Sequence, residues 1–262
     1  MTHTSLNPVG RRCLSFTASA RWAHFRRIDT TTDKQTYRVV PRTTVAGLIG
    51  AILGKPRDSY YDLFAPDCSA IAIQPLTPVE TMQIPMLTLP TKGGDIKQAA
   101  NVSGKTVIDP AVIEETRNRR TFEYLLDPAY RFDVILDDED AYDELKTALE
   151  TGTSVYTPSL GKTECLAEIQ CGDPDSESMD AEFEVKEASD VNAIDSIVPE
   201  SKLTPMPNTS YSMERTPAYM EQDGNHRRTT GFVSYGYAST AEPIPVQGVS
   251  ATVVDGRTVC FI

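Results

Sequence analysis

The sequence predicts an α+β protein whose N-terminal part is ferredoxin-like and whose C-terminal part is a smaller, mostly β section. Segments with strand and helix periodicity follow one another in the order strand, helix, strand, strand, helix, strand, which is typical of a ferredoxin-like domain. A long polar stretch interrupts this pattern. With 262 residues and 40% hydrophobic content, the chain is large enough for such a domain with an elaboration.

The pattern begins with a strand over 12–18, where apolar residues partly alternate with polar ones. A basic, polar stretch follows, and Pro41 blocks helix before it. Apolar residues then recur at helical spacing, with Thr43 or Thr44 as the expected N-cap and Gly54 as the stop. The glycines inside this helix indicate close packing against a neighbouring element.

The second half of the pattern surrounds the polar stretch. Residues 90–120 are polar and too long for an ordinary connection, so we expect a protruding hairpin or a mobile functional loop there. Acidic residues crowd the first turn of an amphipathic helix, which suits the helix dipole. The elements expected around the loop are strands at 69–76, 81–89, 122–126 and 130–136, the helix at 138–151, and a strand at 163–170.

These elements suggest two sections. A domain over residues 1–170 contains the six-element pattern, with the protruding segment at about 90–121. Residues 172–200 form an acidic linker, and the remainder is strand-like and rich in Pro and Tyr. We therefore expect a smaller β-rich section over 171–262, including that linker.

Cysteine usage and hydropathy limit the environment of the chain. The five cysteines are scattered and none has C-x-x-C spacing, which argues against a zinc ribbon or a redox pair and favours a reducing compartment. The longest apolar run, 45–53, is too short to span a bilayer, and the N-terminus has no apolar signal core. We expect a cytoplasmic protein with no membrane contact, no metal and no other cofactor.

The charge is unevenly distributed. The net charge is −12, yet residues 1–57 contain ten Lys/Arg and two acids, which indicates an anion-binding face on an acidic body unless the clustering is chance. Only nine basic residues are Lys, whereas Asp supplies twenty acids, a balance typical of proteins in a high-salt cytosol. Because salt weakens phosphate contacts, stacking and hydrogen bonds would have to contribute more to the binding of any nucleic acid in such a cytosol.

Three segments together resemble the family-five Cas proteins, with the match covering roughly residues 10–170. They are TASARWAHFRR (17–27), YRVVPRTTVAGLIGAILG (37–54), which is the most specific, and TPSLGKTECLAEI (157–169). Between them, RRTFEYLLDPAYRFDV (119–134) is similar to the strand that follows the thumb hairpin of the family. The composition suggests a haloarchaeal, type I-B-like member.

The resemblance implies a function. Family-five proteins have an RRM/ferredoxin-like domain with a protruding β-hairpin thumb, and they cap the 5′ handle of the crRNA in the Cascade interference complex. The thumb, here about 90–121, inserts into the guide and touches the first family-seven backbone subunit. The protein also docks the large family-eight subunit, and so contacts target DNA only indirectly, through the complex. We expect the same non-catalytic role in antiviral defence here.

The first candidate RNA contacts are aromatic and basic. Guanidinium groups can bind phosphates and rings can stack on splayed bases, which is the usual chemistry of single-stranded RNA recognition. The alternative is that the aromatic rings are core and the arginines merely solvated. The candidates are Arg21, Trp22, His24, Phe25, Arg26 and Arg27.

A second group lies at the start of the first helix. Arg42, Thr43 and Thr44 stand at a helix N-terminus, where free N–H groups and the dipole favour a phosphate, although simple capping is the alternative. Tyr37 and Arg38 could frame the same pocket.

Basic residues also punctuate the expected thumb, where a hairpin that enters a guide needs cations on both arms. The alternative is ordinary solubilising charge on an exposed loop. The candidates are Lys105, Arg117, Arg119 and Arg120, with Lys92 and Lys97 before them. Lys162, in the Leu-Gly-Lys turn of the third resembling segment, is a further RNA-binding candidate. A P-loop is excluded there because Tyr156 stands where that motif needs Gly.

The alternative function is a metal-independent endoribonuclease that processes CRISPR repeat RNA. Enzymatic relatives use Tyr, Lys and His, and general acid–base work most often needs a His poised near neutral pH. Of the three histidines, His3 lies near the terminus and His226 in a polar loop, which leaves His24. We expect no catalytic residue, because no Lys-His pair lies near the thumb and the carboxylates form no recognisable metal cluster.

Overall fold

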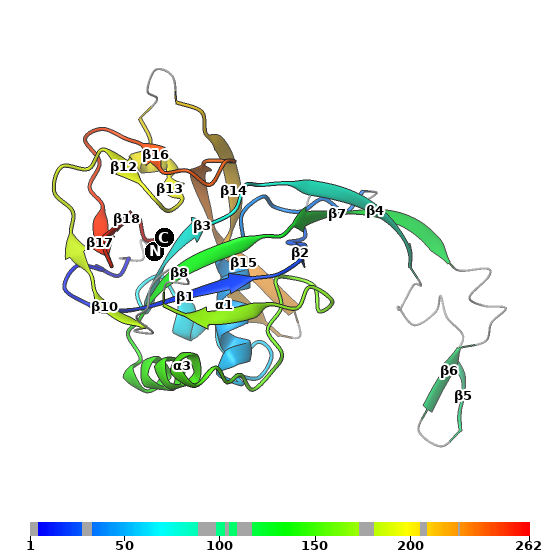
Figure 1. Ribbon diagram of the computed structural model, residues 1–262. Coiled ribbons are helices and arrows are strands. Elements are labelled where there is room, and N and C mark those ends of the chain that lie inside the picture. Colours follow the sequence, from blue (N-terminus) through cyan, green and yellow to red (C-terminus); the bar gives the residue numbers. More distant parts are fainter. Residues whose placement is uncertain are drawn as a thin grey trace.

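A computed structural model describes residues 5–27, 33–88, 98–102, 105–108, 117–172, 181–204, 209–224 and 226–262. Its centre is a twisted antiparallel sheet (Figure 1) of β1 (Arg12–Ser19), β3 (Ser69–Pro75), β8 (Ala129–Leu136), β9 (Glu168–Cys171) and β10 (Glu182–Glu184). The pairing order is β10–β1–β8–β3, and β9 pairs with β1 as well, beyond the end of β10. The strands expected at 12–18, 69–76 and 130–136 are confirmed to within a residue.

Two α-helices, α1 (Arg42–Ile52) and α3 (Glu139–Thr151), occur in the described residues. The α3 prediction is confirmed at both ends: the Asp138 carboxylate accepts a hydrogen bond from the Ala141 N–H, and Gly152 ends the helix at a φ of 64°. The expected Thr43 or Thr44 cap is wrong. Pro41 occupies the N-cap position, so both threonines lie within the first turn. Within the described residues, no helix is long and apolar enough to span a membrane.

The two faces of the central sheet pack against different parts of the chain, because alternate residues of a strand point to opposite sides. Side chains of one face form the main core with α1 and α3; among them are Leu14, Phe16, Ile71, Ile73, Phe132 and Val134. The opposite face, which includes Cys13, Ala72 and Ile135, packs against Val254 and Val259 near the C-terminus.

A buried ion pair fixes the C-terminal strands to the sheet. Arg257 binds both carboxylate oxygens of Asp133, at 2.7 and 2.9 Å, and also reaches the Ser15 hydroxyl at 3.2 Å. Strand β10 lies beyond residue 171 yet joins the central sheet. The two sections expected from the sequence therefore share one sheet, and contacts cross the expected boundary at residues 170 and 171.

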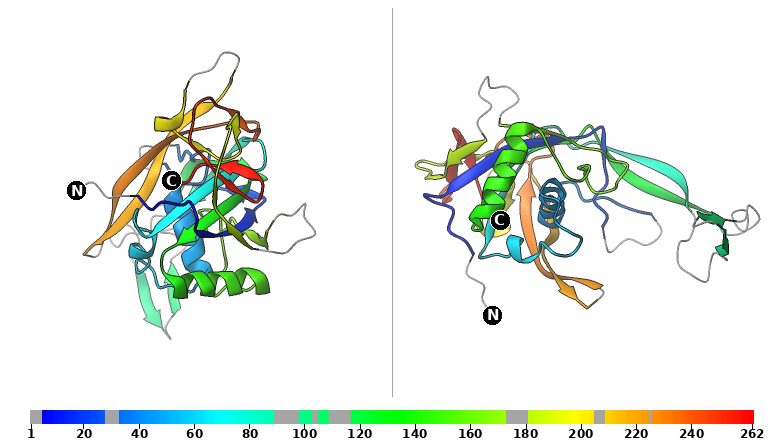
Figure 2. Two further views of the ribbon diagram at one scale, coloured as in Figure 1. Left: turned by 90° about the vertical axis from the view of Figure 1, so that its left-hand side faces the viewer. Right: turned by 90° about the horizontal axis from the view of Figure 1, so that it is seen from below.

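Residues 181–262 contribute mostly strands in the described part of the chain. The longest of these elements are the paired strands β14 (Ser212–Asp223) and β15 (His226–Tyr237), which leave the body in a different direction from the arm described below (Figure 2). The shorter elements are β11 (Lys186–Glu187), β12 (Ala193–Ile194), β13 (Val198–Pro199), η2 (Glu200–Lys202), β16 (Ile244–Pro245), β17 (Thr252–Val254) and β18 (Arg257–Val259). A further 3-10 turn, η1 (Asp62–Phe64), follows α1 in the N-terminal section.

A long arm extends from the body (Figure 1). Its base is a second antiparallel sheet of β2 (Trp22–Ala23), β7 (Asn118–Leu126) and β4 (Thr81–Thr88). Farther out, β5 (Gln98–Val102) pairs with β6 (Lys105–Ile108). The expected strand at 122–126 is longer than predicted, because β7 begins at Asn118 and pairs with β4 from Asn118 to Leu125. Of the thumb expected at about 90–121, residues 90–97, 103–104 and 109–116, with Lys92 and Lys97, lie outside the described residues.

Candidate nucleic-acid interface

One face of the arm sheet carries aromatic and apolar side chains. Residues directly opposite each other in an antiparallel pair share a face, and Tyr124 lies opposite Met82, as Phe122 lies opposite Ile84. Trp22, on β2, packs edge-on against Tyr124 with ring centroids 5.5 Å apart. The rings of Trp22, Tyr124 and Phe122 form an aromatic strip on this face. Arg120 is on the same face, two residues before Phe122, so a cation continues the aromatic strip toward the tip of the arm.

Lys162 lies over the aromatic strip. Its amino nitrogen is 4.3 Å from the Phe122 ring centroid, donates a 2.9 Å hydrogen bond to the Tyr124 hydroxyl, and forms an ion pair with Glu164. A cation over an aromatic face is attracted by the ring quadrupole. Partial burial by itself would lower the pKa of Lys162, but the hydrogen bonds to Glu164 and Tyr124 outweigh it and the pKa is raised. The amino group is therefore positively charged at neutral pH.

A tight turn presents Lys162. Gly161 has a φ of 92°, and a Cβ there would lie 2.1 Å from the carbonyl oxygen of His24. The N–H of Leu160 donates to the carbonyl of Cys165, whose own N–H donates to the carbonyl of Lys162. Leu160 and Cys165 are buried. The strand expected at 163–170 is therefore wrong before Glu168, because residues 160–165 are turned back on themselves.

His24 packs against the Phe122 and Tyr124 rings of this strip, at centroid distances of 5.6 and 5.5 Å. The ring is only 2% exposed, and Nδ1 is 2.7 Å from the carbonyl oxygen of Glu123, an arrangement in which Nδ1–H is the donor. Its Nε2 has no hydrogen-bond partner in the described part of the chain. Burial lowers the pKa of His24, so the imidazole is neutral at neutral pH. Such a ring can support its aromatic neighbours, but it offers no open face for a base.

The other residues of the first candidate group differ in exposure. Arg21 and Arg26 are exposed and Trp22 is half-buried, so all three are accessible for RNA contact. Arg27 is half-buried, with its guanidinium 5.6 Å from the centroid of the Tyr37 ring. Phe25 is 2% exposed and belongs to the main core, so the core alternative holds for this ring.

Arg38 is held in place by two acidic residues. Its guanidinium donates a 3.0 Å hydrogen bond to Glu123 and forms an ion pair with it, while its backbone N–H donates to the carboxylate of Glu214. The side chain as a whole is 35% exposed, but the guanidinium nitrogen Nη1 is buried. Tyr37 is buried beside it. Because Tyr37 is 7% and Arg42 is 1% exposed, neither side chain is open to an RNA phosphate beside Arg38.

The prediction of a phosphate contact for Arg42 is corrected by its burial. The side chain is 1% exposed, and its guanidinium donates to the carbonyl oxygens of Phe64, Ser69, Ala218 and Ile262 and to the Ser69 hydroxyl. It also lies 4.4 Å from the centroid of the Tyr219 ring. Arg42 therefore joins α1 to segments far away in the sequence and has no surface for RNA. Thr43 and Thr44 are half-buried beside it.

The cations of the arm are accessible. Arg117, Arg119 and Arg120 are all exposed at the start of β7. Lys105 is the first residue of β6, and the structure describes its backbone but not its side chain. The arm thus carries arginines directly beside the aromatic strip. Tyr124 is only 2% exposed, so the rings available for stacking are the half-buried Trp22 and Phe122.

Sequence reasoning missed three residues of this site: Phe122, the buried Tyr124 and Glu164. The first two lie in the expected strand and were interpreted only as part of it. Their alternation beside Arg120 was an available signal for a basic, aromatic strand face. No local pattern could have linked Glu164 and Lys162 to that face, because about forty residues separate the turn from the strand.

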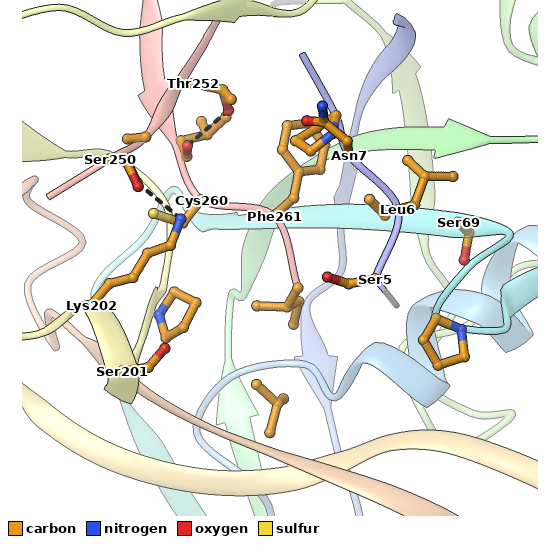
Figure 3. Close-up of a pocket in the computed structure, with 18 of the residues that line it drawn as sticks. Ser5, Leu6, Asn7, Ser69, Ser201, Lys202, Ser250, Thr252, Cys260 and Phe261 are labelled. Carbon is orange, nitrogen blue, oxygen red and sulfur yellow. Dashed lines mark hydrogen bonds between the residues drawn. The ribbon is translucent and has the colours of Figure 1, made fainter. Parts of the chain in front are cut away.

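A separate pocket of about 580 Å³ lies where the N-terminal segment meets the C-terminus (Figure 3). Leu6, Asn7 and Phe261 line it, and Lys202 donates a 2.9 Å hydrogen bond to the Ser250 carbonyl at its edge. The pocket does not include the residues of the aromatic strip. Among the described residues, no group of three His, Cys, Asp or Glu side chains could hold a metal ion.

Comparison with known proteins identifies the family. A chain of a CRISPR RNA-guided surveillance complex has a TM-score of 0.53 at 12% identity, with 90% of this chain and 91% of that chain covered, which shows a shared fold. A CRISPR protein from Archaeoglobus fulgidus has a TM-score of 0.49 at 13% identity, with 95% and 98% covered. No curated protein matches significantly. The family model described as "CRISPR-associated protein (Cas_Cas5)" matches residues 13–222, so the chain belongs to the Cas5 family of CRISPR-associated proteins.

Proposed function

We propose that this chain is a non-catalytic subunit of a CRISPR Cascade interference complex, in which it binds the crRNA and caps its 5′ handle. The observation that carries the proposal is the charged amino group of Lys162 over Phe122, beside the exposed Arg120 on the same strand face. Membership of the Cas5 family and the fold shared with a chain of a CRISPR RNA-guided surveillance complex support it.

The chemistry of this surface fits single-stranded RNA. Aromatic side chains stack on bases of any sequence, while arginines bind the backbone phosphates. The chain as a whole is acidic, with a net charge of −12, so general electrostatic attraction cannot hold RNA on it. A local combination of cation and ring is therefore the feature that would make binding possible, and stacking would persist in high salt.

The proposal includes several finer assignments. The order β9–β1–β8–β3, all antiparallel, supports an RRM/ferredoxin-like arrangement, because it places the fourth, first, third and second strands of that motif side by side. The arm is the thumb that meets the family-seven backbone subunit, and the body docks the family-eight subunit in a cytoplasmic complex. The abundance of Asp over Lys supports a haloarchaeal, type I-B-like system.

Purification of the tagged chain from its host in high salt tests this function. Sequencing of the bound RNA should return mature crRNAs with a common 5′ handle, and mass spectrometry should identify a backbone subunit and a large Cas subunit. A chain that purifies without RNA and without partners, under conditions that preserve other ribonucleoprotein complexes of the host, would contradict the proposal.

A second candidate function, a metal-independent endoribonuclease, is favoured by one observation. The Lys162 amino group donates a hydrogen bond to the Tyr124 hydroxyl, and the ring centroids of His24 and Tyr124 are 5.5 Å apart. The three residue types used by enzymatic relatives therefore lie together. Against it, Nε2 of His24 is buried, and the raised pKa values of Lys162 and Tyr124, with burial the main cause for Tyr124, leave neither as a base at neutral pH.

Incubation of the purified chain with CRISPR repeat RNA in the presence of a chelator separates the two functions. A binding subunit leaves the repeat intact, whereas a nuclease cuts it at one position. If cleavage occurs, Tyr124→Phe removes the hydroxyl that Lys162 contacts but keeps the ring, so a loss of cleavage without a loss of RNA binding would assign the activity to this cluster.

A further inference from the structure

An open groove lies at the end of the molecule away from the arm. It is formed by the C-terminal end of α1, the outer side of α3 and the connecting segment 153–155, and it has a volume of about 730 Å³. Its apolar lining comes from Ile52, Leu53, Ala148 and Val155. In Figure 1, α3 and the arm lie at opposite sides of the body, so this α3 groove is separate from the proposed RNA surface.

The loop beside the groove holds apolar side chains in solvent. Val155 is 67% exposed and Tyr156 is 54% exposed. Their backbone is nevertheless fixed, because the N–H groups of Val155 and Tyr156 donate to the carbonyls of Ile52 and Ala51 at 3.1 and 3.0 Å. The Ile52 carbonyl is one that the end of a helix leaves without an intrahelical partner, and the Ala51 carbonyl also accepts from the Gly54 N–H at 3.3 Å. The exposure is therefore a fixed feature of the fold, and exposed apolar side chains that border a groove are typical of interaction surfaces.

The rim of the α3 groove is acidic. Asp140, Asp143 and Glu144 line it and are exposed. Glu144 forms an ion pair with Lys55 at 3.3 Å, whereas Asp140 and Asp143 form no ion pair within the described residues. The negative rim repels phosphates, so the groove does not suit a nucleic acid. It attracts a cationic partner.

We propose that the α3 groove docks a basic, amphipathic segment of another protein. Lys or Arg side chains of that segment would pair with Asp140 and Asp143, and its apolar side chains would pack on Leu53 and Val155. The acidic rim and the exposed apolar side chains together determine which kind of partner fits the groove. A polyamine would use the acids alone and leave the apolar side chains exposed, and an acidic or neutral peptide would gain nothing from the rim.

Binding of a designed probe to the purified full-length chain tests this proposal. The probe is a fluorescent peptide that forms a helix with Leu on one face and Lys on the other, and its control is a scrambled peptide of the same composition. Because the chain is acidic overall, both peptides are attracted to it, and the comparison isolates the amphipathic contribution. We expect the probe to bind about tenfold more tightly than the scrambled peptide. Equal binding would overturn the proposal.

Three variants locate the site. The double variant Asp140→Asn, Asp143→Asn removes two charges of the rim. Val155→Thr keeps the shape of Val155 but replaces a methyl group with a hydroxyl. Each of these two variants should weaken binding of the probe about threefold to tenfold. Glu187→Gln removes an exposed charge outside the groove and should have no effect. Unchanged probe binding in the first two variants would overturn the proposal. Single-stranded RNA binding, measured in parallel, should be unaffected by all three, so the docking site and the RNA-binding proposal fail independently.

Discussion

The amino group of Lys162 donates a 2.9 Å hydrogen bond to the hydroxyl of Tyr124, and this contact joins the turn at 160–165 to the base of the arm. It places a positive charge on a strip of aromatic side chains that continues into the exposed arginines of β7. Glu164 already neutralises part of that charge, so in the proposed function the amino group would exchange a carboxylate for a phosphate.

Lys162→Met should weaken binding of single-stranded RNA about tenfold and reduce the slope of log affinity against log salt by about one, because one phosphate contact is lost. The matched control is Lys146→Met. Lys146 is similarly exposed, at 32% against 28%, and is also paired with a glutamate, but on α3. Fluorescence anisotropy at several salt concentrations measures the RNA affinity of both variants and its dependence on salt. Equal losses of affinity in the two variants would contradict a specific role for Lys162.

Glu164→Gln should strengthen RNA binding about threefold, because Lys162 no longer has to leave a charged partner. Partial burial would raise the pKa of Glu164, but the hydrogen bond from Lys162 reverses this and the pKa is lowered, so the carboxylate is ionised at neutral pH. The control, Glu182→Gln, removes the partner of Lys146 in the same way. Weaker RNA binding by Glu164→Gln, measured by the same anisotropy assay, would show that the carboxylate positions Lys162 instead of competing for it.

Gly161→Ala should destabilise the fold by more than the cost of its backbone conformation. A positive φ costs a non-glycine residue about 1–2 kcal/mol, and at Gly161 the added Cβ would also meet the His24 carbonyl oxygen at 2.1 Å. Gly248→Ala is the control, because Gly248 has a φ of 68° and no atom within 4 Å of the added Cβ. Urea unfolding measures both. Equal destabilisation would mean that the turn yields easily and is not a rigid support for Lys162.

Local signals predicted the elements whose ends are set by neighbouring residues. Helix α3 is confirmed at both ends because Asp138 and Gly152 cap it through contacts within a turn. The strand expected at 163–170 is wrong at its start because tertiary contacts decide the conformation there. Leu160 and Cys165 are buried, and Gly161 packs against the backbone of His24, which lies far away in the sequence.

The candidate surface could be predicted only in part for the same reason. Arg26, Arg119 and Arg120 are exposed, as expected for basic residues in polar segments. Arg42 and Phe25 were candidates on the same chemical grounds, a cation for phosphates and a ring for bases, but both are buried. Nothing near Arg42 in the sequence indicates that its guanidinium donates to the carbonyl oxygens of Ala218 and Ile262. Burial of a charged side chain depends on partners that the fold brings together, and periodicity along one segment does not report them.

Arg42→Met should destabilise the protein by about 3–5 kcal/mol, because the carbonyl oxygens of Phe64, Ser69 and Ala218 lose their buried donor. The exposed Arg57, with a side-chain exposure of 77%, provides the control Arg57→Met, which should change the free energy of unfolding by less than about 0.5 kcal/mol. Urea unfolding measures both changes. Under conditions where Arg42→Met is still folded, its RNA affinity should equal that of the wild type. A selective loss of affinity without loss of stability would restore Arg42 as a phosphate ligand.

Glu123→Gln should change how stability depends on pH. Partial burial would raise the pKa of Glu123, but hydrogen bonds from Arg38 and from the Thr36 N–H outweigh it, and the pKa lies below the ordinary value of 4.5. A carboxylate whose pKa is lowered on folding stabilises the protein above its unfolded pKa, and this contribution is lost as the pH falls through the folded pKa. We therefore expect the wild type to be more stable than Glu123→Gln by about 1–2 kcal/mol at neutral pH, with the difference shrinking below pH 4.5.

The comparison with the variant is necessary because Glu214 acts in the opposite direction. Burial raises the pKa of Glu214, so its contribution to stability falls as the pH rises. Glu214 is present in both proteins and cancels in the difference between their free energies of unfolding. Urea unfolding at a series of pH values measures that difference. If it stays constant from neutral pH to well below 4.5, the Arg38–Glu123 pair contributes no charge-dependent stability, and exchange of Glu123 for a phosphate would cost the fold none.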